Sequence, residues 1–181
     1  MNHRVPGFLA GGISAGIKSS QQPDLGLIVS QVPAAAAAVF TTNKIKAAPV
    51  IVSRERLTKS GNLVRAVLVN SGNANACTGS AGIDHVRTVC HDLAGALNIP
   101  DSQVLMSSTG IIGVPLPIRL ISGSLSRLVG ALSPDGIDDF AHAIMTTDTF
   151  PKVVMRTFEL SGRHISLCGI AKGAGMIMPQ M

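Results

Sequence analysis

The residues best suited to bind a ligand or to catalyse a reaction lie in loops of small polar residues and glycines that follow apolar stretches. Two such segments carry no charge at all: 66–83, AVLVNSGNANACTGSAGI, and 102–118, SQVLMSSTGIIGVPLPI. Glycines in a loop let neighbouring backbone N–H groups point the same way and bind an anion, and short hydroxyl side chains leave room for a ligand. These segments therefore predict either a ligand site or ordinary tight turns.

Complete catalytic motifs are absent from the sequence. It contains no G-x-S-x-G elbow, no H-E-x-x-H motif and no P-loop. Cys90 and His91 are adjacent on a predicted helix and so point in different directions, and His85 lies five residues before Cys90. We expect no metal site, and the chain by itself supplies no full set of nucleophile, base and oxyanion donors.

Lys172 is a second candidate for ligand binding. It lies between small residues in AKGAGMIMPQM, the last segment of the sequence. A lysine in such a setting either extends its ammonium group to solvent or faces an anionic ligand. An apolar segment at the end of the sequence indicates either a fragment boundary or a processed end, with the nucleophile starting a separate chain.

The composition excludes several classes of protein. Of the 181 residues, 46% are hydrophobic and only 14% are charged, which is incompatible with an intrinsically disordered chain. Aromatic residues make up 3%, too few for stacking on nucleic-acid bases. The net charge of +5 comes from scattered basic residues and indicates no nucleic-acid patch. The low charge predicts a surface that is partly covered by a partner protein.

The cysteines and the apolar segments indicate the cellular compartment of the protein. Cys77, Cys90 and Cys168 form no disulfide or zinc pattern, which is typical of a reducing compartment. The first residues contain no signal-peptide pattern. The uncharged segment 25–43 is interrupted by Pro33, so two strands are favoured over a membrane helix. We therefore expect a cytoplasmic protein that binds neither membrane nor nucleic acid.

The elements that must position these loops follow from hydrophobic periodicity. The predicted strands are 25–31, 34–40, 64–69, 104–106, 153–160 and 163–170, with a further hairpin in 7–18 that bends at Gly11–Gly12. The predicted helices are 49–59, 82–97, 118–132 and 136–147. Strands that alternate with helices before a closing hairpin at Ser161–Gly162 predict an α/β layered sandwich with a mixed sheet. We expect a single domain over 1–181.

Five motifs, in one order along the chain, resemble the α subunit of the ornithine acetyltransferase family of arginine biosynthesis. They are AVFTTNKIKAAPV (38–50), VNSGNANACTG (69–79), SSTGIIG (107–113), TTDTFPK (146–152) and AKGAGMIMP (171–179). Five ordered motifs are far more specific than one Gly-rich loop.

The resemblance implies a precursor that cleaves itself before a threonine, which becomes the N-terminal nucleophile of a β chain. Acetyl passes from N-acetylornithine to this threonine and then to glutamate. Some members also accept acetyl-CoA, so we expect no cofactor other than acetyl-CoA as an optional co-substrate. The implied fold resembles the autoproteolytic N-terminal-nucleophile hydrolases, and the implied assembly is α2β2.

Individual residues take roles from the resemblance. Thr109 and Gly110 match the oxyanion hole, and Thr146 and Lys172 match substrate contacts. The segment 70–73, NSGN, is close to the site without assigned roles. The sequence departs from the family pattern in having Gln180 where Asn is common and in stopping at Met181, before the Ala that precedes the nucleophilic Thr.

Two other functions stay open at this point. An amidase or aminopeptidase of a related autoproteolytic fold would use the same Thr109–Gly110 donors but would lack the SGNANACTG and TTDTFPK motifs. A phosphate-binding module would begin a helix directly after its Gly-rich loop, whereas Pro115 and Pro117 intervene here.

Overall fold

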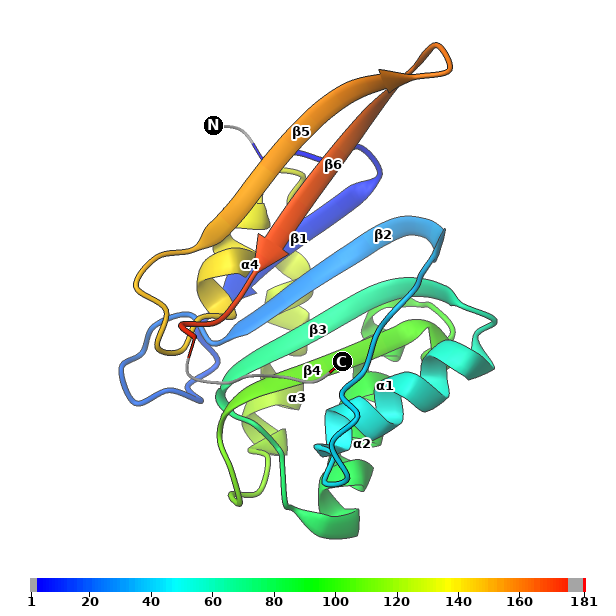
Figure 1. The fold of residues 1–181 in the computed structure, drawn as a ribbon. Coiled ribbons are helices and arrows are strands. Elements are labelled where there is room, and N and C mark those ends of the chain that lie inside the picture. The colour runs from blue at the N-terminus through cyan, green and yellow to red at the C-terminus, as the bar shows by residue number, and fades with distance from the viewer. Residues whose placement is uncertain (1–2, 176–180) are drawn as a thin grey trace.

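The structure is a computed structural model that describes residues 3–175 and 181. The strands are β1 (Phe8–Ile13), β2 (Leu25–Ala35), β3 (Leu63–Asn73), β4 (Val104–Ile111), β5 (Lys152–Leu160) and β6 (Arg163–Ala171). The helices are α1 (Ala48–Lys59), α2 (Gly79–Leu97), α3 (Ile118–Gly130) and α4 (Ile137–Ala143), with a 3-10 turn at Asp101–Gln103. Figure 1 shows their arrangement.

A four-stranded mixed sheet forms the centre of the molecule. Its order is β1-β2-β3-β4; β1–β2 and β2–β3 are antiparallel, and β3–β4 is parallel. Helix α2 makes the crossover that a parallel neighbour requires. The predicted α/β class with a mixed sheet is thus confirmed. Because β3 and β4 are parallel, their carboxyl ends meet at one edge, which is where open α/β sheets bind ligands.

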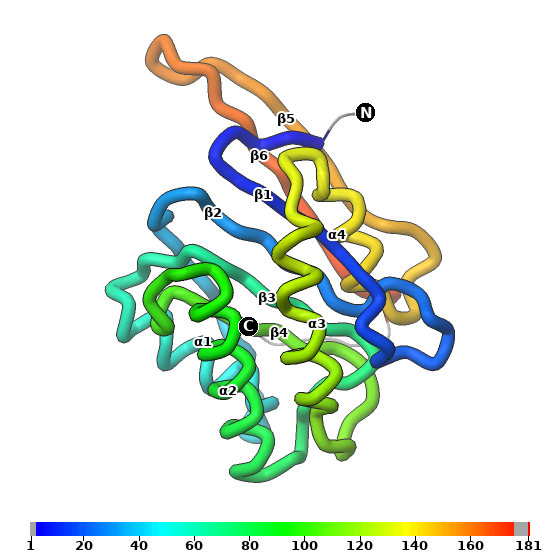
Figure 2. The backbone as a smooth tube through the Cα atoms, turned by 180° about the vertical axis from the view of Figure 1, so that it is seen from behind, coloured from blue at the N-terminus to red at the C-terminus, as the bar shows by residue number. Residues whose placement is uncertain are grey.

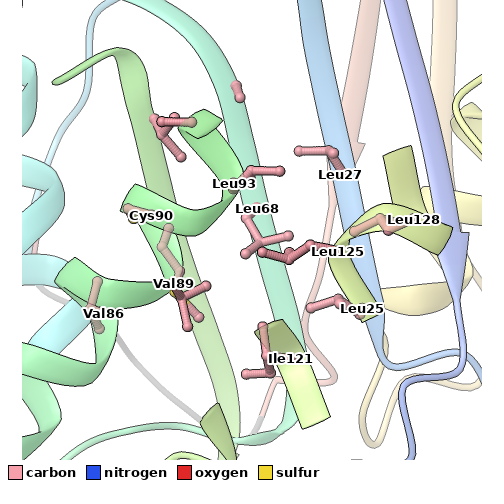
Figure 3. Close-up of a cluster of buried hydrophobic side chains, with 14 of the residues drawn as sticks. Leu25, Leu27, Leu68, Val86, Val89, Cys90, Leu93, Ile121, Leu125 and Leu128 are labelled. Atoms are coloured by element: carbon pink, nitrogen blue, oxygen red, sulfur yellow. The ribbon is translucent and has the colours of Figure 1, made fainter. Parts of the chain in front are cut away.

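The main hydrophobic core lies between one face of this sheet and α2 and α3 (Figures 2 and 3). Leu25 and Leu27 of β2 and Leu68 of β3 have no exposed surface. Val89 and Leu93 of α2 pack against them, as the helical periodicity of 82–97 predicts. Burying each such side chain stabilises the fold by about 1.5–3 kcal/mol.

Helix α1 covers the outer edge of β4, one of the two edge strands of the sheet. The Ser53 hydroxyl donates to the Met106 carbonyl oxygen over 2.8 Å and accepts from the Met106 amide over 3.1 Å. An unpaired strand edge is an aggregation site unless it is covered. The buried Ser53 thus satisfies β4 backbone groups that have no neighbouring strand.

The other face of the sheet packs on α4 and on the β5–β6 hairpin. Alternate residues of β1 and β2, among them Ala10 and Ile28, join Phe140 of α4 in a second apolar cluster. Val153 and Ile170 of the hairpin pack against the same cluster. Beyond it, the hairpin extends past the rest of the molecule (Figure 1). Its apolar side chains Phe158, Leu160 and Leu167 are exposed.

The prediction of a hairpin bent at Gly11–Gly12 is wrong, because β1 passes straight through both glycines. A Cβ on Gly11 would lie 3.0 Å from the Ala131 carbonyl oxygen. On Gly12 it would lie 2.1 Å from the Asp139 carbonyl oxygen. These glycines therefore allow two helix ends to approach the strand closely, as glycines within strands often do.

Three other boundaries differ from the prediction. The predicted strands 25–31 and 34–40 are one strand, β2, whose register shifts between Val29 and Ala34 and which ends at Ala35. Strand β4 is longer than 104–106 and takes in Thr109 and Gly110. Helix α4 is shorter than 136–147 and ends at Ala143, so that Thr146 lies after it.

The remaining predicted elements are close to those observed. Helices at 49–59, 82–97 and 118–132 correspond to α1, α2 and α3, and the hairpin turns at Ser161–Gly162. Both turn residues have positive φ, 51° and 73°, as a two-residue hairpin loop requires. Within the described part of the chain, no helix is both long enough and apolar enough to cross a membrane.

Candidate active site

Thr109 and Gly110 lie near the carboxyl end of β4, directly beside the end of β3. In the parallel ladder Thr109 pairs with Ser71, and Gly110 pairs with Gly72. Among the described residues, the Thr109 hydroxyl has no hydrogen-bond partner. The sheet thus holds a hydroxyl donor and a backbone amide donor in consecutive positions on a rigid strand.

Only glycine fits at position 110. Its φ is 138°, a conformation that residues with a side chain rarely adopt. A Cβ there would lie 2.3 Å from the carbonyl carbon of Gly72 and 2.5 Å from the amide nitrogen of Asn73. The close approach of the two strand ends therefore depends on this glycine.

The segment 70–73 fixes the strand ends through buried hydrogen bonds. Asn70 donates to the Asn73 carbonyl oxygen over 2.8 Å and accepts from the Ser108 hydroxyl over 2.6 Å. Ser71 donates to the carbonyl oxygen of Ala143, at the end of α4, over 2.6 Å. The sequence alone assigns these residues no role; the structure shows that they tie β3 to β4 and to the end of α4.

The two predicted substrate contacts are brought together from separate parts of the chain. Thr146 follows α4, and Lys172 follows β6. The Lys172 ammonium nitrogen donates to the Thr146 hydroxyl oxygen over 2.7 Å. Both residues are exposed, and Lys172 forms no ion pair with the described carboxylates. An ammonium group has three donors, so two remain for an anion.

Asp148 holds this pair in place, and sequence analysis missed it. Its Oδ1 accepts from the Lys152 ammonium group and from the Gly173 amide, each over 2.7 Å. Its Oδ2 accepts from the Thr146 amide over 3.2 Å. One carboxylate thus joins the segment that carries Thr146 to the segment that carries Lys172. An aspartate between hydroxyl residues, in TTDT, was the signal that could have indicated a local hydrogen-bond acceptor.

The Asp148 side chain is only 1% exposed. Burial alone would raise its pKa, but the hydrogen bonds from Lys152, Gly173 and Thr146 favour the charged form more strongly. The net result is a pKa well below the usual range of a carboxyl group. Asp148 is therefore an ionised structural acceptor rather than a proton donor at neutral pH.

Another buried carboxylate, Asp24, shapes the loop between β1 and β2. Asp24 has no exposed surface, and its two oxygens accept from the backbone amides of Ala15, Ile17 and Lys18 over 2.6–2.9 Å. The loop thereby lies against the end of β3: a Cβ on Gly72 would contact Lys18 Cγ at 3.2 Å. Lys18 is thus a further residue beside the strand ends that sequence analysis did not identify.

All four predicted site residues belong to one region of the molecule. Gly110 pairs with Gly72 in the β3–β4 ladder, and Lys18 Cγ lies 3.2 Å from where a Cβ on Gly72 would be. On the other side, Ser71, next to Gly72, donates to the carbonyl oxygen of Ala143, three residues before Thr146. In Figure 1, the carboxyl ends of β3 and β4, the β1–β2 loop, the segment before β5 and the end of β6 lie at the same side.

Other reactive groups lie outside this region or lack partners. Among the described residues, no three His, Cys, Asp or Glu side chains are grouped to bind a metal ion. Burial raises the pKa of the Cys90 thiol to about 12, so this thiol is inert as a nucleophile. Residues 176–179, which end the last motif, lie outside the described residues. So does Gln180, where the sequence departs from the family pattern.

Comparison with known proteins finds close relatives. Residues 9–181 match the ArgJ family. A protein of Geobacter sulfurreducens named arginine biosynthesis bifunctional protein ArgJ is 51% identical over 177 residues, which are 98% of this chain and 44% of that protein. The chain thus spans less than half the length of this curated relative.

Two solved structures share the fold over nearly the whole chain. The crystal structure of arginine biosynthesis bifunctional protein argJ from Bacillus halodurans is 41% identical, with a TM-score of 0.91, and the match covers 97% of this chain and 91% of that one. Ornithine acetyltransferase from Mycobacterium tuberculosis, complexed with ornithine, is 39% identical, with a TM-score of 0.88 over 97% and 92% of the two chains.

Proposed function

The chain belongs to the ArgJ family, and from this premise we propose that it is the α part of a glutamate N-acetyltransferase. The complete enzyme moves an acetyl group from N-acetylornithine to glutamate through an acetyl-threonine intermediate. The single observation that supports this best is that two donors on β4, Thr109 and Gly110, lie at the same end of the sheet as the Thr146–Lys172 pair.

The donors on β4 suit the chemical step. When a threonine hydroxyl attacks the acetyl carbonyl, negative charge develops on the carbonyl oxygen, the amide C–N bond breaks, and the amine of ornithine leaves with the proton. The Thr109 hydroxyl and the Gly110 amide would donate to that oxygen, which is worth about 10²–10³ in rate for each donor. The same two donors would serve the second half of the reaction, in which the amine of glutamate attacks the threonine ester.

The Thr146–Lys172 pair suits recognition. N-Acetylornithine and glutamate share an α-carboxylate, and the Lys172 ammonium group has free donors for one. The Thr146 hydroxyl accepts from Lys172 and keeps its own proton for a second hydrogen bond. The relative from Mycobacterium tuberculosis was solved with ornithine, an amino acid of this class.

The nucleophile belongs to the proposed β chain. Met181 lies in a groove of about 350 Å³ lined also by Ser107 and Ser108, the residues just before Thr109. A threonine that follows this part of the chain in the precursor would begin close to the oxyanion donors. The exposed apolar residues of the β5–β6 hairpin, among them Phe158 and Leu167, would be covered by the β chain or a second α chain in an α2β2 assembly. We place the enzyme in the cytoplasm.

The test is an acetyl-transfer assay with the complete two-chain protein. Incubation with N-acetylornithine and glutamate should yield ornithine and N-acetylglutamate in equal amounts, and release of ornithine should continue only while glutamate is present. Continued release of ornithine and free acetate without glutamate would instead identify an amidase. Tight binding of inorganic phosphate without any transfer would identify a phosphate-binding module.

We also propose that the enzyme can use acetyl-CoA as an alternative acetyl donor and that it needs no other cofactor. The same assay with labelled acetyl-CoA in place of N-acetylornithine decides this point. Labelled N-acetylglutamate would show that acetyl-CoA is used as a donor, and the absence of N-acetylglutamate would show that acetyl-CoA is not a donor for this enzyme.

A further inference from the structure

A second pocket lies between α1 and the segment 38–46, and none of its lining residues belongs to the proposed active site. Its volume is about 630 Å³. Apolar lining comes from Leu57, which is 7% exposed, and from the half-buried Phe40. Lys46 and Arg54 line it as well. The pocket therefore offers a ligand both an apolar wall and two cations.

The charges that line this pocket all have one sign. Lys46 and Arg54 are its charged residues, and none of the described Asp or Glu side chains lines it. Among the described residues, the Arg54 guanidinium group has no hydrogen-bond or ion-pair partner. The carboxylate next to it in the sequence, Glu55, pairs with Arg87 of α2 instead. Two cations without a carboxylate attract an anion to this part of the surface.

The donors in the pocket suit a phosphate group. The Lys46 ammonium group donates to the Asn43 carbonyl oxygen over 2.7 Å, which uses one of its three protons. The Thr41 hydroxyl accepts from the Asn43 amide over 3.2 Å, and within the described part of the chain nothing accepts its proton. A guanidinium fork, an ammonium group and a hydroxyl group together can donate to the several oxygens of one phosphate.

The pocket continues into the groove that reaches the proposed oxyanion donors. Phe40 and Thr41 line both the pocket and the groove of about 350 Å³. The groove is also lined by Ser108, the residue before Thr109, and most of its other lining residues are apolar. A ligand long enough to fill both would thus have an anionic end at the two cations and an uncharged end near Thr109.

Acetyl-CoA has this distribution of charge, since its phosphate groups and its thioester lie at opposite ends of a long, uncharged arm. We propose that the pocket binds phosphate groups of acetyl-CoA, with Lys46 and Arg54 as their ion-pair partners, and that the arm follows the groove to Thr109 and Gly110. This inference rests on the proposed function, which supplies acetyl-CoA as an alternative acetyl donor. N-Acetylornithine carries no phosphate and does not use the pocket.

The acetyl transfer from this donor follows the same course as the proposed reaction. The hydroxyl group of the nucleophilic threonine attacks the thioester carbonyl, the C–S bond breaks, and coenzyme A leaves as the thiol with the hydroxyl proton. The threonine ester then passes the acetyl group to the amine of glutamate. The pocket therefore contributes binding free energy to one acetyl donor and none to the other.

An Arg54→Met variant of the complete two-chain enzyme tests the proposal. Arg54 is exposed and has no partner in the described part of the chain, so its replacement should leave the fold intact. KM for acetyl-CoA should rise at least about tenfold, as for the loss of a charged hydrogen bond, while KM for N-acetylornithine stays unchanged. Lys46→Met should give the same pattern, and Arg54→Lys should recover part of the loss. Unchanged KM for acetyl-CoA in both methionine variants would overturn the proposal.

S-Acetylpantetheine separates the phosphate contacts from any effect on the groove, because it has the same thioester and arm without a phosphate. It should be a poor donor for the unmodified enzyme and no worse for Arg54→Met. Equal losses on acetyl-CoA and on S-acetylpantetheine would overturn the role of the charges. Lys59→Met is the matched control, since it removes a charge from an exposed residue of the same helix that does not line the pocket.

Direct binding keeps this proposal separable from the proposed function. Calorimetric titration with coenzyme A needs no turnover. If the unmodified protein binds coenzyme A about tenfold more tightly than Arg54→Met does but transfers no acetyl group, then the proposed reaction fails while the phosphate pocket stands. Transfer from acetyl-CoA together with equal coenzyme A affinity in the two proteins would retain the reaction and reject the pocket. Absence of measurable coenzyme A binding to the unmodified protein would reject the pocket as well.

Discussion

The two halves of the proposed site are held by different forces. Thr109 and Gly110 belong to a strand whose backbone is paired to β3 and whose neighbours, Asn70 and Ser71, are fully buried. Thr146 and Lys172 lie on exposed segments, joined mainly through the carboxylate of Asp148. The difference indicates that the proposed oxyanion donors are fixed by packing and backbone hydrogen bonds, while the proposed substrate contacts are fixed by a few ionic hydrogen bonds.

The largest effect should come from breaking the packed half. In Gly110→Ala, the new Cβ meets backbone atoms of Gly72 and Asn73, and the φ of 138° is strained for alanine. We expect a loss of about 3–5 kcal/mol in the free energy of unfolding and no measurable acetyl transfer. A thermal melt of the complete enzyme measures this.

Gly113→Ala is the control for Gly110→Ala. Gly113 also has a positive φ, 81°, but a Cβ there meets nothing within 4 Å. It should cost only the backbone strain, about 1–2 kcal/mol, and retain activity. Equal effects of the two changes would show that the contact between the strand ends is unimportant.

Thr109→Ala should affect rate rather than stability. Removing one donor to the developing oxyanion should lower kcat by about 10²–10³ with little change in KM. Thr109→Ser keeps the hydroxyl and should keep most of the activity. Steady-state kinetics beside a thermal melt give the answer: an alanine variant that melts early but turns over normally would make Thr109 a structural residue.

Lys172→Met should have the opposite kinetic signature. The loss of hydrogen bonds to a charged group is worth about 1.5–3 kcal/mol, so KM for both substrates should rise about 10–100-fold at nearly constant kcat. Because Lys172 is exposed, the melting temperature should not change. Wild-type KM values in a correctly processed Lys172→Met enzyme would remove this residue from the substrate site.

Asp148→Asn should give the smallest effect and one that depends on pH. The amide keeps one acceptor oxygen but places a donor against the Thr146 amide, so we expect a loss of about 1–3 kcal/mol in stability and a modest rise in KM. The pKa of Asp148 is lower in the folded state than in the unfolded chain, where it is about 3.9. Its contribution is therefore complete above that value and is lost as the pH falls through the folded pKa.

The difference in melting temperature between the unmodified enzyme and Asp148→Asn should thus shrink on acidification below about pH 4. Asp84→Asn is the control, because Asp84 is an exposed carboxylate on α2. A difference that stays constant from neutral pH into acid would show that the charge of Asp148 contributes nothing.

Local patterns in the sequence predict much of the fold that surrounds the site. The apolar period of α2 and the turn at Ser161–Gly162 depend on neighbouring residues only, and both are observed. The mixed sheet follows from the alternation of strands and helices. Gly11 and Gly12 were misassigned because the groups that approach them, at Ala131 and Asp139, are more than 100 residues away.

The ionic half was harder to predict. The resemblance supplied Thr146 and Lys172, but no local pattern shows that Asp148 would join the segments carrying them. Similarly, spacing alone does not show that Asp24 would turn its carboxylate toward three backbone amides and hold Lys18 at the strand end. Such bonds depend on tertiary structure and become visible only in three dimensions.

The most direct test of the division between the two halves is the rate at which the acetyl-enzyme forms. Rapid mixing of the complete enzyme with saturating N-acetylornithine, without glutamate, followed by acid quenching and intact-mass analysis, measures that single step. Lys172→Met should form acetyl-enzyme at nearly the unmodified rate once saturated, whereas Thr109→Ala should form it about 10²–10³ times more slowly. Normal acylation by Thr109→Ala, or slow acylation by saturated Lys172→Met, would contradict the account.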